Sequence, residues 1–188
     1  MIGCSNEEYG NEYIQGKDAE YMFMNSDIKY ITATDKGYYF INGYYLYYCD
    51  YEIMEPIALC SKPNCLHNKE LDPLKKSKCN AFLNVDFDPK LITVYEDNLY
   101  CYIDYDFEKH PEPNEEVAEL INISLDGSKR ETVCELEENI VTISLHRGKL
   151  YYTTMIVVDV DKGIYNATLK EYDILKKHTK PKEITSIE

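Results

Sequence analysis

GYYFINGYYLYYCD, the stretch from Gly37 to Asp50, consists of two runs of aromatic and aliphatic residues on either side of Asn42-Gly43. Asn-Gly is a preferred pair for the tight turn of a β-hairpin, because both central residues of that turn take positive φ angles at low cost. Aromatic and β-branched residues beside such a turn favour extended strands over helix. The stretch therefore predicts a hairpin whose strands are Tyr38–Ile41 and Tyr44–Cys49.

The start of this hairpin, a turn followed by aromatic residues, returns twice along the chain. Tyr39, Tyr100 and Tyr151 each come just after a short polar turn of similar sequence, and they are 61 and 51 residues apart. Four antiparallel strands repeated at about fifty residues are typical of the blades of a β-propeller. We therefore expect an all-β fold with about three propeller blades. A generic β-sandwich is the alternative fold.

The expected strands are the apolar runs between turn signals. They are Ile28–Thr34, Tyr38–Ile41, Tyr44–Cys49 and Ile57–Cys60 in a first blade at 28–60; Leu91–Tyr95, Leu99–Asp104, Val117–Leu125 and Glu131–Cys134 in a second at 91–136; and Ile140–Leu145, Leu150–Val158, Ala167–Tyr172 and Glu183–Ile187 in a third at 139–187. Consecutive apolar residues are typical of sheets buried on both faces, and they occur at Tyr38–Ile41, Tyr44–Tyr48 and Met155–Val158. We expect no helix longer than about three turns after residue 28.

The number of expected blades is smaller than in a closed propeller, which usually has about four to eight. We therefore expect residues 28–188 to form an incomplete ring, the amino-terminal part of a longer propeller. The last blade of such a part should expose an unpaired face. Residues 1–27 are mostly polar and acidic, and are expected to form a tether before this domain.

The composition excludes some classes of partner. The 188 residues contain 34 acidic side chains and 20 lysines and arginines, a formal net charge of −14. Such a surface repels phosphate backbones, so we expect no direct binding to nucleic acid or to anionic membrane. No apolar run approaches the length of about 20 residues that a membrane-spanning helix needs.

A segment at 60–83 interrupts the repeat and contains the most distinctive chemistry. Cys60, Cys65, His67 and Cys79 form the pattern C-x4-C-x-H-x11-C. Four soft ligands within twenty residues could hold one structural zinc tetrahedrally, with a Pro63-Asn64 turn bringing Cys60 and Cys65 together. The alternatives are a disulfide among Cys60, Cys65 and Cys79, or unpaired thiols. A closed four-ligand site has no open position for a substrate, so its expected role is structural.

The first residues, Met1-Ile2-Gly3-Cys4-Ser5, resemble the end of a bacterial lipoprotein signal, in which the cysteine receives the lipid. A complete signal also has a charged start and an apolar stretch, which we expect upstream of Met1 in the natural precursor. The alternative is a coincidental match. If Cys4 is lipidated, the protein contacts the membrane only through that anchor and functions outside the cytoplasm.

The chain resembles a group of secreted lipoproteins in three stretches taken together. These are the hairpin and the later runs LCSKPNCLH, at Leu59–His67, and CNAF, at Cys79–Phe82. The members of this group are proteins of Gram-positive anaerobic bacteria with an uncharacterised propeller, similar to the low-density-lipoprotein-receptor-related (YWTD-like) and TolB-like propellers. The resemblance covers nearly the whole chain, and the cysteine–histidine segment is its most specific part. It implies the fold and a lipid-anchored place on the outer side of the bacterial cell membrane, and it implies no activity.

The sequence contains no recognisable catalytic constellation. His110, His146 and His178 lie alone near turns, and there is no nucleophile signature, phosphate loop or HExxH motif. Cys49, Cys101 and Cys134 fall within expected strands, where we expect buried thiols. We therefore expect no enzyme but a surface binding or scaffold propeller, which holds an unknown glycan, peptide or protein ligand. The alternative is the propeller portion of a larger hydrolase whose catalytic domain follows residue 188.

Overall fold

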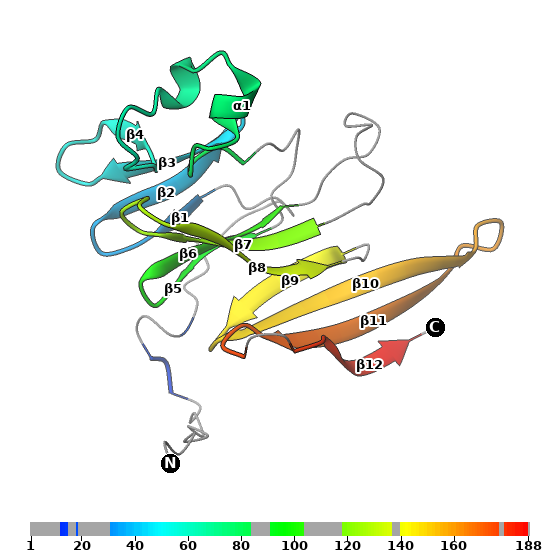
Figure 1. Ribbon diagram of the computed structural model, residues 1–188. Coiled ribbons are helices and arrows are strands. Elements are labelled where there is room, and N and C mark those ends of the chain that lie inside the picture. The colour runs from blue at the N-terminus through cyan, green and yellow to red at the C-terminus, as the bar shows by residue number, and fades with distance from the viewer. Residues whose placement is uncertain are drawn as a thin grey trace.

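A computed structural model of the chain describes residues 12–14, 18, 31–83, 91–103, 118–136, 140–176 and 179–187. The described part is all-β, with three four-stranded antiparallel sheets that lie side by side as layers (Figure 1). Sheet 1 contains β1 (Ile31–Ala33), β2 (Gly37–Asn42), β3 (Tyr45–Asp50) and β4 (Pro56–Ala58); sheet 2 contains β5 (Leu91–Tyr95), β6 (Asn98–Ile103), β7 (Ala118–Ser124) and β8 (Arg130–Leu136); and sheet 3 contains β9 (Ile140–His146), β10 (Lys149–Asp159), β11 (Ile164–Asp173) and β12 (Lys182–Ile187).

The structure confirms the all-β prediction and the four strands in each repeat. In every sheet the strands follow one another in chain order, so each strand pairs with its neighbours in the sequence. The described helices are one turn of 3-10 helix, η1 (His67–Lys69), and α1 (Pro73–Lys76). The expected strand ends at Ile28, Asp104 and Val117 and the expected blade start at Asn139 lie outside the described residues.

The first hairpin forms, but its turn lies one residue later than the sequence predicts. Asn42 pairs with Tyr45 as the last rung of the β2–β3 ladder, so the two turn residues are Gly43 and Tyr44. Gly43 has a φ of +59°, and glycine at the first central position is one of the two common ways to close such a turn. Tyr44 therefore leaves the strand, and it is exposed.

The fourth strand also ends earlier than expected, at Ala58 instead of Cys60. The chain bends there, because the Cys60 N–H donates to the carbonyl of Ala58 at 2.8 Å. This bend takes Cys60 out of the sheet and directs it into the insert that follows.

Sheet 2 is the middle layer and is covered on both faces. Its side chains alternate between two cores: Leu99, Cys101 and Ile103 of β6 pack toward sheet 1. Tyr100 and Tyr102 pack toward sheet 3. The first strands of the sheets also meet, because β1 lies against β5 and β5 against β9. The described residues form an open stack of sheets and close no ring.

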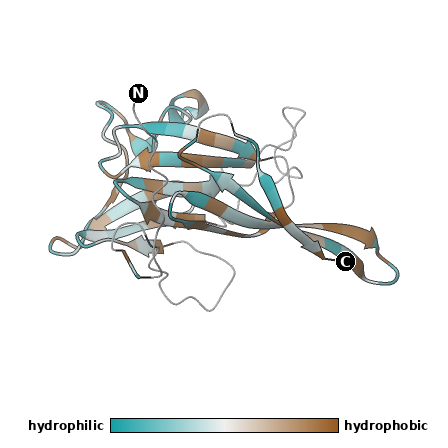
Figure 2. Cartoon of the chain, turned by 90° about the horizontal axis from the view of Figure 1, so that it is seen from below, coloured by the Kyte–Doolittle hydropathy of each residue, from teal (hydrophilic) through white to brown (hydrophobic). Residues whose placement is uncertain are grey.

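Sheet 3 is buried on one face only, which corrects the expectation that Met155–Val158 lies between two sheets. Pairing of β10 with β9 ends at Thr154, so the rest of β10 pairs only with β11 and projects beyond the stack (Figure 1). Ile156 is 67% exposed and Val158 63%. The projecting hairpin is largely apolar (Figure 2), and β12 beside it is exposed at all six positions. Consecutive apolar residues thus mark an uncovered surface in this strand.

Candidate metal centre

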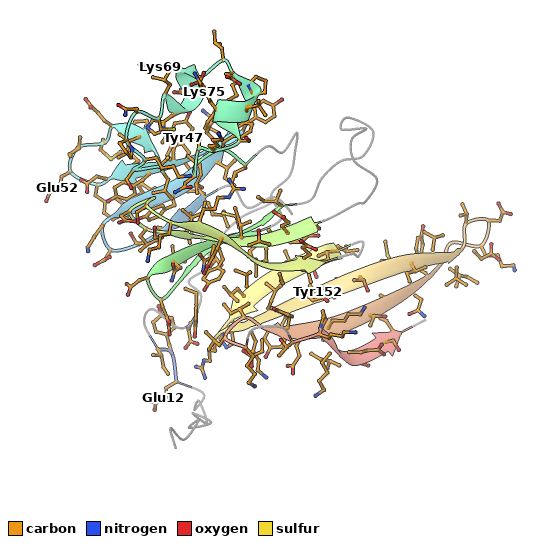
Figure 3. All side chains as sticks on the ribbon, viewed as in Figure 1. Glu12, Tyr47, Glu52, Lys69, Lys75 and Tyr152 are labelled. Carbon is orange, nitrogen blue, oxygen red and sulfur yellow. The ribbon has the colours of Figure 1, made fainter. Side chains whose placement is uncertain are left out.

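The insert at 60–83 is held at both ends by one strand. At its start, the Leu59 N–H donates to the Leu46 carbonyl of β3 at 2.9 Å. At its end, the Leu46 N–H donates to the Ala81 carbonyl at 2.9 Å, and the Leu83 N–H donates to the carbonyl of Tyr44, just before β3, at 2.8 Å. The chain therefore leaves and returns at the same place, and the segment between forms a closed loop on the edge of sheet 1. Lys69 and Lys75, labelled in Figure 3, lie on this loop.

Two local structures bring the four sequence-predicted ligands together. Pro63 and Asn64 form a turn, closed by the Cys65 N–H and the Lys62 carbonyl at 3.4 Å. Asn64 has a φ of +60°, a conformation that asparagine tolerates better than most residues. This turn carries Cys65 back toward Cys60, as the sequence predicts.

The other two ligands are positioned by the short helices. His67 begins η1, and its carbonyl accepts a hydrogen bond from the Tyr45 hydroxyl of β3 at 3.1 Å. Cys79 follows α1, whose first turn is capped by the Asp72 side chain on the Leu74 N–H. The Cys79 N–H donates to the Lys76 carbonyl at 2.9 Å, which turns Cys79 inward.

The four ligand atoms converge. The sulfurs of Cys60, Cys65 and Cys79 and a ring nitrogen of His67 all lie within 4.8 Å of one another. His67 Nδ1 is 3.6 Å from Cys79 Sγ, so the imidazole faces the thiols. A tetrahedral zinc with Zn–S bonds of about 2.3 Å separates its sulfurs by about 3.8 Å, so small side-chain movements complete the geometry. The cluster can therefore hold a metal ion.

The three thiols of the cluster are unbridged, as are Cys49, Cys101 and Cys134. Cys60 and Cys79 are buried, whereas Cys65 and His67 are half-buried. Three unbridged sulfurs and an imidazole lie close together, which favours metal binding over a disulfide, the alternative that the sequence does not exclude. They form a compact set of soft donors.

The thiols of Cys60 and Cys79 differ in acidity. Burial opposes ionisation of Cys60, but hydrogen bonds from the backbone of Lys62 and Asn80 and from the two neighbouring thiols hold the pKa of Cys60 below its ordinary value. Burial raises the pKa of Cys79 to about 12, and the nearby Cys60 adds to this increase. A bound cation would lower the pKa of Cys79 again, because its positive charge stabilises a thiolate directly.

The remaining sequence-predicted residues are not part of the cluster. Cys4, His110 and His178 lie outside the described residues. His146 is near Asp18, with Nε2 and Oδ1 3.8 Å apart. Cys49 and Cys101 are buried in strands, as predicted, and burial raises the pKa of Cys101 to about 12. Cys134 is half-buried instead of fully buried, and burial raises its pKa to about 12.

A cavity of about 760 Å³, which no sequence pattern indicates, lies at the junction of sheets 1 and 2. Its walls include the side chains of Tyr39, Tyr48 and Tyr51 together with the turns after β1, β5 and β7. Tyrosine-rich strands predict a buried core, so the sequence pattern does not indicate that some of these tyrosines line a cavity. The cavity forms only because turns from two sheets meet.

Comparison of the chain with protein-family models, with curated proteins and with solved structures finds no match. In the part of the chain that the structure describes, no helix is long and apolar enough to cross a membrane.

Proposed function

We propose that the insert binds one structural zinc ion through Cys60, Cys65, His67 and Cys79. The convergence of these four side chains within 4.8 Å carries the proposal. Three sulfurs and one imidazole match the preference of zinc for nitrogen and sulfur ligands, whereas calcium and magnesium need oxygen ligands that the cluster does not supply. Four protein ligands complete a tetrahedron, so the metal stabilises structure instead of activating water or substrate.

The metal content of the purified chain tests this proposal. We expect about one zinc per chain by elemental mass spectrometry, because a closed site of this ligand type retains zinc through purification. A strong chelator should remove the zinc and loosen the insert while the three sheets keep their strand content in circular dichroism. A metal content near zero after refolding with excess zinc would contradict the proposal.

We also propose that the three sheets are blades of a β-propeller. Two features of the fold support this. The sheets pack face to face, and the first strand of each lies against the first strand of the next, as strands lining a central axis would. In this arrangement the hairpin turns of successive sheets gather at the ends of the stack, where propellers carry their binding sites.

The cavity favours a binding role as the second candidate function. Its volume of about 760 Å³ is within the range of small-ligand sites, which is about 300–1,000 Å³. Tyrosine rings supply apolar contact area with a hydroxyl at one end, which suits a glycan or a peptide. Under this proposal the protein holds such a ligand on the outer side of a bacterial membrane, anchored through Cys4.

A screen of oligosaccharides and short peptides tests the binding role. Tyr51 is 40% exposed and lines the cavity, so Tyr51→Ala should weaken binding of any ligand found by about tenfold through the loss of aromatic contact. Tyr165→Ala is the control, because Tyr165 is 45% exposed but lies on the projecting hairpin. Equal affinities of the two variants would place the ligand elsewhere.

A further inference from the structure

The β7–β8 turn of sheet 2 is bonded to the insert of sheet 1. The carbonyl of Gly127 accepts two hydrogen bonds, from the Ser61 N–H at 3.2 Å and from Asn80 Nδ2 at 2.9 Å. Ser61 and Asn80 directly follow Cys60 and Cys79, two of the four metal ligands. The groups that hold the turn are therefore one residue away from the groups that would hold the metal.

Close packing accompanies these hydrogen bonds. A Cβ atom on Gly127 would lie 2.7 Å from the backbone nitrogen of Cys60 and 2.7 Å from the carbonyl carbon of Leu59. Gly127 also has a φ of +70°, which side-chain-bearing residues rarely adopt. Only glycine lets the turn approach the backbone of the first ligand this closely.

Arg130, at the start of β8, adds a second connection. Its Nη1 donates to the carbonyl of Phe82, and it lies 3.4 Å from the carbonyl of Asn80. The Asn80 side chain is buried, so its hydrogen bond to Gly127 has no competing water. Hydrogen bonds thus join the insert and the β7–β8 hairpin in both directions: the insert donates from Ser61 and Asn80, and the hairpin donates from Arg130.

The two residues before Gly127 in the same turn form part of the cavity wall. The carbonyl of Leu125 accepts a hydrogen bond from the Tyr39 hydroxyl of β2 at 3.2 Å, and Leu125 and Asp126 line the cavity wall. A movement of the turn would therefore change both the contact between sheets 1 and 2 and the shape of the cavity.

We propose that metal binding to Cys60, Cys65, His67 and Cys79 holds the β7–β8 turn of sheet 2 against sheet 1, and we call this connection the latch. A metal that fixes Cys60 and Cys79 also fixes Ser61 and Asn80, which hold Gly127 and with it the β7–β8 turn. Metal occupancy then sets the position of one wall of the cavity. This inference rests on the proposed zinc site, and it adds that the effect of the metal extends beyond its own loop to the neighbouring sheet.

Hydrogen exchange measured by mass spectrometry, on the zinc-loaded and the chelated chain, tests the latch. We expect exchange at 61–80 and at the β7–β8 turn, 124–130, to become at least about tenfold faster without metal. The Ser61 amide donates to Gly127 and so reports directly on the docking of the turn, whereas the Gly127 amide donates to Ser124 at 2.8 Å and reports on the order of the turn itself. Strands β5 and β6 should keep their exchange rates and serve as the internal control.

Asn80→Ala separates the latch from metal binding, because it removes the buried hydrogen bond to Gly127 and leaves all four ligands in place. This variant should still bind about one zinc, but zinc should slow exchange in the turn much less than in the unaltered chain, because only the weaker Ser61 hydrogen bond to Gly127 remains. Asn122→Ala is the matched control: the Asn122 side-chain amide donates to Glu131 across the same two strands at 3.3 Å, in an exposed hydrogen bond that involves neither Gly127 nor the insert. This control should show the same zinc effect as the unaltered chain.

The two proposals fail in different ways. If zinc binds and slows exchange only within 61–80, while the turn exchanges equally fast with and without metal, the latch is wrong and the zinc site stands. If no zinc binds, both are wrong. Should Asn80→Ala fold poorly, the comparison of the loaded and chelated unaltered chain still decides the question.

Discussion

Cys79→Ala should abolish zinc binding, and it should lower the free energy of unfolding more than replacement of any cysteine outside the cluster. Cys79 is 2% exposed, and its sulfur is one of the four converging ligand atoms. Removing one of four ligands leaves an incomplete tetrahedron, and a metal that binds only the folded state contributes about 4 kcal/mol when its free concentration is a thousand times Kd. The zinc content should fall from about one per chain to near zero.

The control for this prediction is Cys101→Ala. Cys101 is 0% exposed and lies in β6, so the substitution removes the same atoms from an equally buried site without touching a ligand. It should cost about 1 kcal/mol in the free energy of unfolding and leave the zinc content unchanged. Elemental analysis and urea unfolding, both in excess zinc, provide the measurements. Equal losses of stability with equal zinc contents would show that Cys79 is only a packed thiol.

Leu120→Ala should lower the free energy of unfolding by about 2–5 kcal/mol. Leu120 is 0% exposed and packs in the core between sheets 2 and 3. Sheet 2 is covered on both faces, so neighbouring side chains cannot move into the space without disturbing a second layer. The cost is therefore that of a large-to-small substitution whose cavity stays open.

Leu71→Ala removes the same atoms from the insert, where Leu71 is 87% exposed, and it should change the free energy of unfolding by less than about 0.5 kcal/mol. Urea unfolding followed by circular dichroism measures both variants. A cost below about 1 kcal/mol for Leu120→Ala would mean that sheets 2 and 3 do not share a tight core.

The strands could be predicted from the sequence because their signals are local. Leu91–Tyr95 is a strand with the predicted ends, since a run of β-branched and aromatic residues stops at the Glu96-Asp97 turn. The first hairpin shows the limit of such signals. Asn42-Gly43 is correct as a turn signal, but the pairing of Asn42 with Tyr45 moves the turn by one residue. Register depends on the whole ladder and on which face is buried, which a dipeptide does not encode.

The four candidate metal ligands could also be found from the sequence, because three cysteines and a histidine occur within twenty residues. Whether the thiols are bridged or free could not be found from the sequence. Whether Cys60, Cys65 and Cys79 bridge or stay free depends on where the Pro63-Asn64 turn and the helix α1 place their sulfurs. The structure leaves all three unbridged and turns His67 toward them.

By itself, then, the sequence determined the all-β class, the threefold repeat of four strands and the identity of the candidate ligands, because turn residues, strand propensity and ligand spacing act over a few residues. Tertiary structure alone decided which surfaces are covered. Met155–Val158 and the strands of sheet 2 are both apolar, yet only sheet 2 lies between two layers. The approach of Gly127 to Cys60 joins residues 67 positions apart, and no local pattern specifies such a contact.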